Sequence, residues 1–116
     1  MVRQIAPHHW PTVYDFAIVV LALEPEALAN RYGLVFQSLE DDLGEYKRAA
    51  IELADGAQCI LSRHREVPSP GTNVFVDYAA DHARARELVL QALDLPPAAF
   101  SWINPHSNDM ANPSGE

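Results

Sequence analysis

The chain is poor in cysteine, glycine and basic residues, and each shortage excludes a class of protein. The single cysteine, Cys59, excludes an internal disulfide and a cysteine-rich metal site. The five glycines are scattered, which excludes a glycine-rich loop that cradles phosphate groups. Because Cys59 lies within a predicted strand, we expect a buried, unreactive thiol and no cysteine nucleophile.

Long apolar runs are also missing. The longest, Phe16–Leu23, is much shorter than the roughly 18 residues that cross a membrane. Met1–Trp10 carries Pro7 and lacks the apolar core of a signal peptide. The sequence therefore predicts an unprocessed cytoplasmic protein that does not bind membranes.

The charge balance is strongly acidic. Lys and Arg number 8 against 16 Asp and Glu, which gives a net charge of −8 at pH 7. Nucleic-acid binding needs clustered basic residues that neutralise phosphates, so a nucleic-acid partner is not expected. An acidic surface suits a basic protein partner.

Length and composition fit one ordinary globular domain. Of the 116 residues, 48% are hydrophobic and 21% are charged, so wholesale disorder is excluded. We place the domain at residues 13–104. An irregular arm with two prolines precedes it at residues 1–12, and a loose polar tail follows at residues 105–116.

Strand patterns are clearest in the middle of the chain. Glu45–Ala54 alternates between apolar and polar residues, and Gln58–His64 forms a second strand. Asp55-Gly56 between them is a strong hairpin signal. A third strand, Asn73–Tyr78, follows a proline-rich loop at Val67–Gly71. These residues predict an antiparallel sheet.

The preceding part of the chain predicts a strand, a helix and another strand. Val13–Leu23 is apolar at nearly every position, which predicts a central strand buried on both faces. Pro25 suits the first position of a short helix, and Gly33 suits its C-terminal cap. Leu34–Leu39 is predicted as a strand that leads into an acidic turn.

The C-terminal part contains the strongest helix signal. Asp81 is a plausible N-cap for a helix at His82–Leu93, whose apolar residues form one stripe. Phe100–Ile103 is predicted as a short strand or turn. The complete order, βαβββ and then βα, predicts an α+β fold: a largely antiparallel sheet of about five strands with two helices on one face.

Catalytic signatures are not found. The five histidines do not have the spacing of metal ligands, and no serine occupies a Gly-x-Ser-x-Gly motif. We therefore expect no catalytic residues, no metal and no cofactor.

Two groups of residues remain as binding candidates. Four carboxylates crowd one turn, where they form either a solvated tip or a contact for a basic partner: Glu40, Asp41, Asp42 and Glu45. A second group could hold a small ligand, since two of its members end a strand and the third is a charge within an apolar strand: Arg63, His64 and Asp77.

A family resemblance rests on four segments: Tyr14–Leu23, Arg31–Leu34, Ala50–Gly56 and Cys59–Leu61. Their order resembles one βαβββ module of the vicinal oxygen chelate, or glyoxalase-like, superfamily. Asn73–Leu93 resembles the strand and helix that open a second module. The resemblance covers about two thirds of the chain and its motifs are unspecific.

The resemblance implies a site that this chain does not complete. The family builds its site from two complete modules, and its enzymes place His, Glu or Gln ligands on the first and fourth strands. Here the first strand carries Ile18 and Val20, and the fourth offers only Gln58, Ser62 and His64. The resemblance therefore implies a single-module protein that dimerises to enclose a small ligand or a metal.

Two functions follow as expectations. The first is a non-enzymatic, surface-acting binding protein of the immunity or antitoxin type, whose acidic turn binds a basic protein. The alternative is the glyoxalase-like homodimer, with Arg63, His64 and Asp77 near its pocket. A third interpretation, a subunit of a larger assembly, follows if a partner covers one face of Val13–Leu23.

Overall fold

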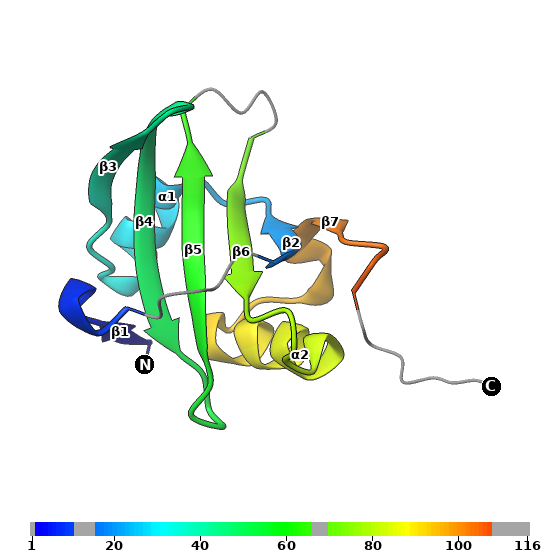
Figure 1. Cartoon of the computed structure of the whole chain (residues 1–116). Helices are drawn as coiled ribbons and strands as arrows, with labels where there is room; N and C mark the ends of the chain where they lie inside the picture. Colours follow the sequence, from blue (N-terminus) through cyan, green and yellow to red (C-terminus); the bar gives the residue numbers. More distant parts are fainter. Residues whose placement is uncertain (1, 11–15, 66–69, 108–116) are drawn as a thin grey trace.

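An antiparallel sheet forms the body of the computed structural model, which describes residues 2–10, 16–65 and 70–107 (Figure 1). The described residues contain seven strands: β1 Arg3–Ile5, β2 Phe16–Leu21, β3 Gln37–Asp41, β4 Gly44–Glu52, β5 Gln58–His64, β6 Thr72–Val76 and β7 Phe100–Ile103. They also contain two α-helices and two 3-10 turns: α1 Pro25–Tyr32, α2 His82–Leu93, η1 Pro7–His9 and η2 Pro97–Ala99. The predicted α+β class is confirmed.

The strand order is not the chain order. The described strands lie in the order β1-β4-β5-β6-β2-β7, and β3 also pairs with β4. β3 pairs with residues 44–48 of β4 and β1 pairs with residues 50–52, so both lie along one edge of β4. The late strand β6 is inserted between β5 and β2, which makes β7 the opposite edge of the sheet.

A bulge in β2 explains why its apolar and polar residues do not alternate. Ala17 faces Phe75 of β6 and Val19 faces Val74, so the register shifts around Ile18. A bulge of this kind turns two consecutive residues toward one side. Ile18 and Val19 are therefore both fully buried, whereas Val20 on the other face is only half-buried. β2 has a strand on each side, as predicted, but the predicted burial of both faces is wrong, because the helices cover only one face and Ala17 and Val20 line a groove on the other. Residues 13–15 of the predicted strand lie outside the described residues.

Capping residues account for the boundaries of the helices. Pro25 is the first residue of α1, and Gly33 ends it with a left-handed φ of 71°. The Asp81 side chain accepts a hydrogen bond from the Arg84 amide at the start of α2. The Tyr32 hydroxyl donates to the Leu93 carbonyl at 2.6 Å and so joins the ends of the two helices.

The core lies between the sheet and the two helices, which cover the same face (Figure 1). Alternate strand residues point toward the helices and are buried: Ala49, Ile51, Cys59, Leu61, Val74 and Val76. The helices contribute Leu28, Leu88, Val89 and Leu93, all at most 2% exposed. Each such side chain contributes about 1.5–3 kcal/mol when it leaves water, so this layer holds the sheet and helices together.

Some predicted boundaries were wrong. The arm at residues 1–12 is not wholly irregular, because Arg3–Ile5 pairs with β4 and the Gln4 side chain bonds the backbone of Val35. The strand predicted at Leu34–Leu39 begins later, at Gln37, since Leu34 is buried in the core outside the sheet. The pairing of residues 3–5 and the burial of Leu34 both depend on segments distant in sequence, so a local sequence pattern does not predict them.

The chain after β7 is described only as far as residue 107. The Asn104 side-chain amide donates to the Ala17 carbonyl at 2.8 Å, and the Asn104 backbone carbonyl accepts from the Ser107 hydroxyl at 2.9 Å. The first residues of the predicted loose tail therefore form a hydrogen-bonded turn. Residues 108–116 of that prediction lie outside the described part of the chain.

Candidate functional site

The hairpin of β3 and β4 carries the four predicted partner-binding carboxylates, and residues 40–45 are called the acidic hairpin below. Asp41 pairs with Gly44 in the register, so Asp42 and Leu43 form the tip. The Asp41 carboxylate accepts a hydrogen bond from the Leu43 amide at 2.9 Å, an Asx turn that fixes the tip. Its exposed groups are therefore held in a defined position.

Two like charges face each other across the hairpin. Glu40 is the direct cross-strand partner of Glu45. Carboxylates in this position repel and destabilise a sheet. An ion pair of Glu45 with Arg65, at 3.6 Å, offsets part of this repulsion. Among the described residues, no ion pair involves Glu40 or Asp42. The facing pair therefore places two exposed carboxylates side by side on the surface of the hairpin.

A hydrophobic side chain lies in the middle of these charges. Leu43 is 72% exposed, the highest value among the large hydrophobic residues described as exposed. Hairpin tips normally carry small or polar residues. This leucine is an exposed apolar group within an acidic segment, and apolar groups bordered by polar ones are typical of protein interfaces. The only sequence signal for this feature is a single apolar residue between Asp42 and Gly44.

The other face of the hairpin is braced by aromatic and charged side chains. The Asp41 carboxylate is hydrogen-bonded to His64, with Oδ2 of Asp41 lying 2.9 Å from Nε2 of His64. The His64 ring stacks on Tyr46, with ring centres 4.7 Å apart, and the Arg48 guanidinium lies 5.5 Å from the centre of the Tyr46 ring. The hydrogen bond from His64 lowers the pKa of Asp41 below its ordinary value. Asp41 and His64 thus position the hairpin.

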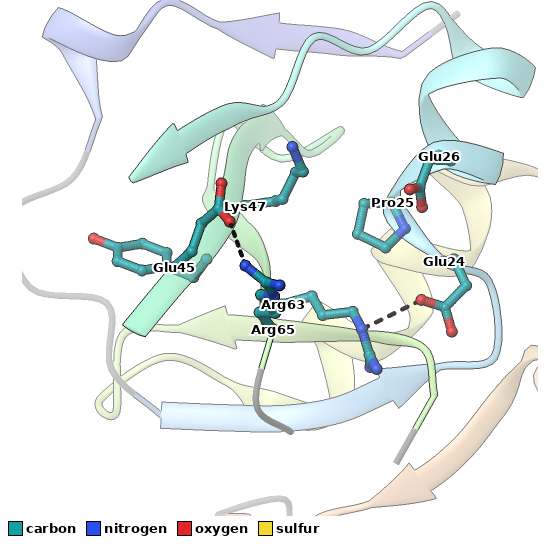
Figure 2. Close-up of a pocket in the computed structure, with 8 residues that line it drawn as sticks. Glu24, Pro25, Glu26, Glu45, Lys47, Arg63 and Arg65 are labelled. Atoms are coloured by element: carbon teal, nitrogen blue, oxygen red, sulfur yellow. Dashed lines mark ion pairs between the residues drawn. The ribbon is translucent and has the colours of Figure 1, made fainter. Parts of the chain in front are cut away.

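A mixed-charge pocket opens beside the acidic hairpin on the side of the sheet that faces α1 (Figure 2). Its volume is about 280 Å³. Carboxylates and cations line it in equal number: Glu24, Glu26, Glu45, Lys47, Arg63 and Arg65. Figure 2 shows Arg65 directed toward Glu45 and Arg63 toward Glu24. The two arginines of the pocket are therefore paired with the protein's own carboxylates, whereas Lys47 donates a hydrogen bond to the Ser38 hydroxyl at 2.9 Å.

One ion pair of this pocket fastens the chain segments around it. Arg63 Nε lies 3.3 Å from the Glu24 carboxylate, and the same guanidinium donates to the Gly71 carbonyl at 2.9 Å. Glu24 also accepts a hydrogen bond from the Gly71 amide at 2.8 Å. The three residues join the start of α1, the end of β5 and the start of β6. We call this arrangement the Glu24–Arg63–Gly71 bracket.

The residues predicted for a small ligand lie in three places. Arg63 lines the mixed-charge pocket. His64 points to the opposite face of the sheet, where it contacts Asp41 and Tyr46. Asp77 follows β6 at the far end of the sheet, and its carboxylate accepts a hydrogen bond from the Ala79 amide. The described structure does not bring these three side chains to one pocket.

Other chemistry is sparse in the described residues. No three His, Cys, Asp or Glu side chains among them are arranged to hold a metal ion. Cys59 is fully buried, and burial raises the pKa of its thiol to about 12. No helix in the described part of the chain is long and apolar enough to span a membrane. Comparisons with protein-family models, curated proteins and solved structures gave no match.

Proposed function

We propose that this protein binds a basic protein partner through the acidic hairpin. The observation that carries the proposal is the facing pair Glu40 and Glu45, next to the exposed Leu43. Charge repulsion and an exposed leucine both cost the free protein stability or solubility. A bound partner with a cationic, partly apolar surface would offset both costs.

The carboxylates and the leucine have separate roles in this proposal. The net charge of −8 and the unpaired carboxylates attract a basic partner and accelerate its association. Leu43 then enters an apolar depression on the partner and loses its contact with water, which slows dissociation. The Asx turn of Asp41 reduces the entropy lost on binding, because the tip is already ordered.

The partner class that fits is a cationic protein such as a toxin or nuclease, with this chain as its stoichiometric inhibitor. Small acidic immunity proteins and antitoxins act in this way. Inhibition would follow from covering the partner's basic surface, so it needs no catalytic group. The acidic hairpin would be the centre of the contact.

The test begins with capture of partners from an extract of the source cells on the immobilised chain. One variant carries Glu40→Gln and Asp42→Asn, which remove two carboxylates of the acidic hairpin. A matched control carries Glu26→Gln and Glu87→Gln, which remove two exposed carboxylates of the helices. A third variant, Leu43→Ser, removes the apolar anchor and leaves the charge unchanged.

The expected result is a basic protein that the wild type and the helix control retain. The hairpin variant should lose roughly tenfold or more in association rate with the purified partner, with a weaker dependence on salt. Leu43→Ser should raise the dissociation rate instead. Equal losses in the hairpin variant and the helix control would refute the proposal, because net charge alone would then explain capture.

A further inference from the structure

The strand β7 forms an edge of the sheet with an unusual lack of charge. Residues 95–108 contain no Asp, Glu, Lys or Arg, the longest such stretch in a chain with 24 charged residues. β7 pairs with β2 on one side, and in the described residues no strand lies on its other side (Figure 1). Natural edge strands are usually protected by charges. This one carries none.

The backbone of β7 can pair outward. The Asn104 amide donates to the Ile18 carbonyl of β2 at 2.8 Å. Because successive residues of a strand direct their backbone groups to opposite sides, the amide and carbonyl of Ile103 point away from β2. These are the groups that a further strand would bond.

Two large apolar side chains on this edge are exposed. Trp102 is 44% exposed and Ile103 is 50% exposed. Beside Trp102 lies a groove of about 630 Å³, whose lining residues are all uncharged: Ala17, Val20, Ala22, Pro70, Asn73, Ser101 and Trp102. The neutral edge therefore continues onto the adjoining face of the sheet. We call this surface, β7 with the groove, the neutral edge.

We propose that the neutral edge is a homodimer interface, in which β7 of one copy pairs antiparallel with β7 of a second copy. A two-fold axis would bring the same residues of both copies together, as in most soluble dimers. The two sheets would become one, and the Trp102 side chains would lie together over the two grooves. The arrangement is independent of the acidic hairpin, which stays free on each copy.

The lack of charge on the neutral edge favours a second copy of this chain as its binding partner. Two copies that each carry a net charge of −8 repel wherever charged surfaces meet. Among the described residues that form the neutral edge, neither copy brings a charged side chain to the contact. The other edge of the sheet carries Arg3 on β1 and Glu40 and Asp41 on β3. A cationic partner would gain little from the neutral edge, since the carboxylates of the acidic hairpin lie at the opposite side of the sheet.

The experiment measures mass by sedimentation velocity from about 1 μM to about 1 mM, a range that covers weak and moderate dimer dissociation constants. Ile103→Lys places a charge at the centre of the contact and should raise the dissociation constant at least tenfold. Val35→Lys is the matched control, because Val35 is similarly exposed at 63% but lies before β3. It should leave the dissociation constant unchanged.

Hydrogen exchange provides a second readout that does not depend on a variant. The Ile103 amide should exchange more slowly as the wild-type concentration rises, because a β7–β7 hydrogen bond protects it. Circular dichroism checks that Ile103→Lys is folded, and if it is not, exchange of the wild-type Ile103 amide decides the question. A monomer at all concentrations would overturn the proposal. A dimer that leaves Ile103 exchange unchanged, or that Val35→Lys disrupts equally, would also overturn it.

Discussion

Gly71 provides the most demanding test of the structure around the mixed-charge pocket. Its φ is 113°, a region that residues with a side chain rarely adopt. A Cβ at this position would overlap the carbonyl oxygen of Leu21 and lie 3.0 Å from Cγ1 of Val20. The change Gly71→Ala therefore requires both an unfavourable backbone conformation and a movement of β6 away from β2.

The expected loss follows from these two contributions. The backbone conformation costs about 1–3 kcal/mol, and the overlap with backbone atoms adds roughly 1–3 kcal/mol, as overpacking does in other cores. We expect a total of about 2–6 kcal/mol, a large share of the roughly 5–15 kcal/mol that stabilises a typical domain. The Glu24–Arg63–Gly71 bracket would be displaced as well.

The assay compares urea unfolding of the wild type, Gly71→Ala and Gly33→Ala. Gly33 is a matched control, because its φ of 71° is also positive but a Cβ there would meet no atom within 4 Å. Gly33→Ala should cost only about 1 kcal/mol, the penalty of the left-handed backbone alone. If the two variants are equally stable, Gly71 does not approach β2 as described and the reasoning is wrong.

Three further predictions concern single side chains. His64 lowers the pKa of Asp41, so the stability that Asp41 contributes is present above its unfolded-state pKa and is lost as pH falls toward the lower folded-state pKa. Asp41→Asn should therefore make the free energy of unfolding depend less on pH below about pH 4. An unchanged pH dependence in the variant would contradict this. Burial raises the pKa of Cys59 to about 12, so a thiol reagent should label it only in denaturant, and rapid labelling of the native protein would exclude a buried thiol. Tyr32→Phe removes the hydrogen bond to the Leu93 carbonyl and should cost about 0.5–1.5 kcal/mol in chemical unfolding, whereas no loss would show that this bond does not link the helices.

Local patterns succeeded where one segment contains the whole cause. The proline and glycine that bound α1 act within a few residues, and so does the Asp81 cap of α2. The β4–β5 hairpin was predictable from Asp55-Gly56 between two alternating runs, and its seven register pairs confirm it. The position of the four carboxylates on one turn was likewise a property of consecutive residues.

Local sequence patterns do not predict contacts between segments that are distant in the chain. The arm gained β1 only because β4 presents a free edge to Arg3–Ile5. The Glu24–Arg63–Gly71 bracket joins residues 47 positions apart at its widest hydrogen bond. His64 was grouped with Arg63 because they are neighbours in sequence, although side chains of adjacent strand residues point to opposite faces.

The amino-acid sequence by itself determined the α+β class, the two helices, the central hairpin and the strong acidity, because propensity, caps and turn residues are local. Tertiary structure alone decided that β6 separates β5 from β2, that β1 pairs with β4, and that uncharged β7 forms an edge. Strand order depends on which distant surfaces bury each other best. That choice is a property of the whole folded chain, and the proposed β7 interface depends on it.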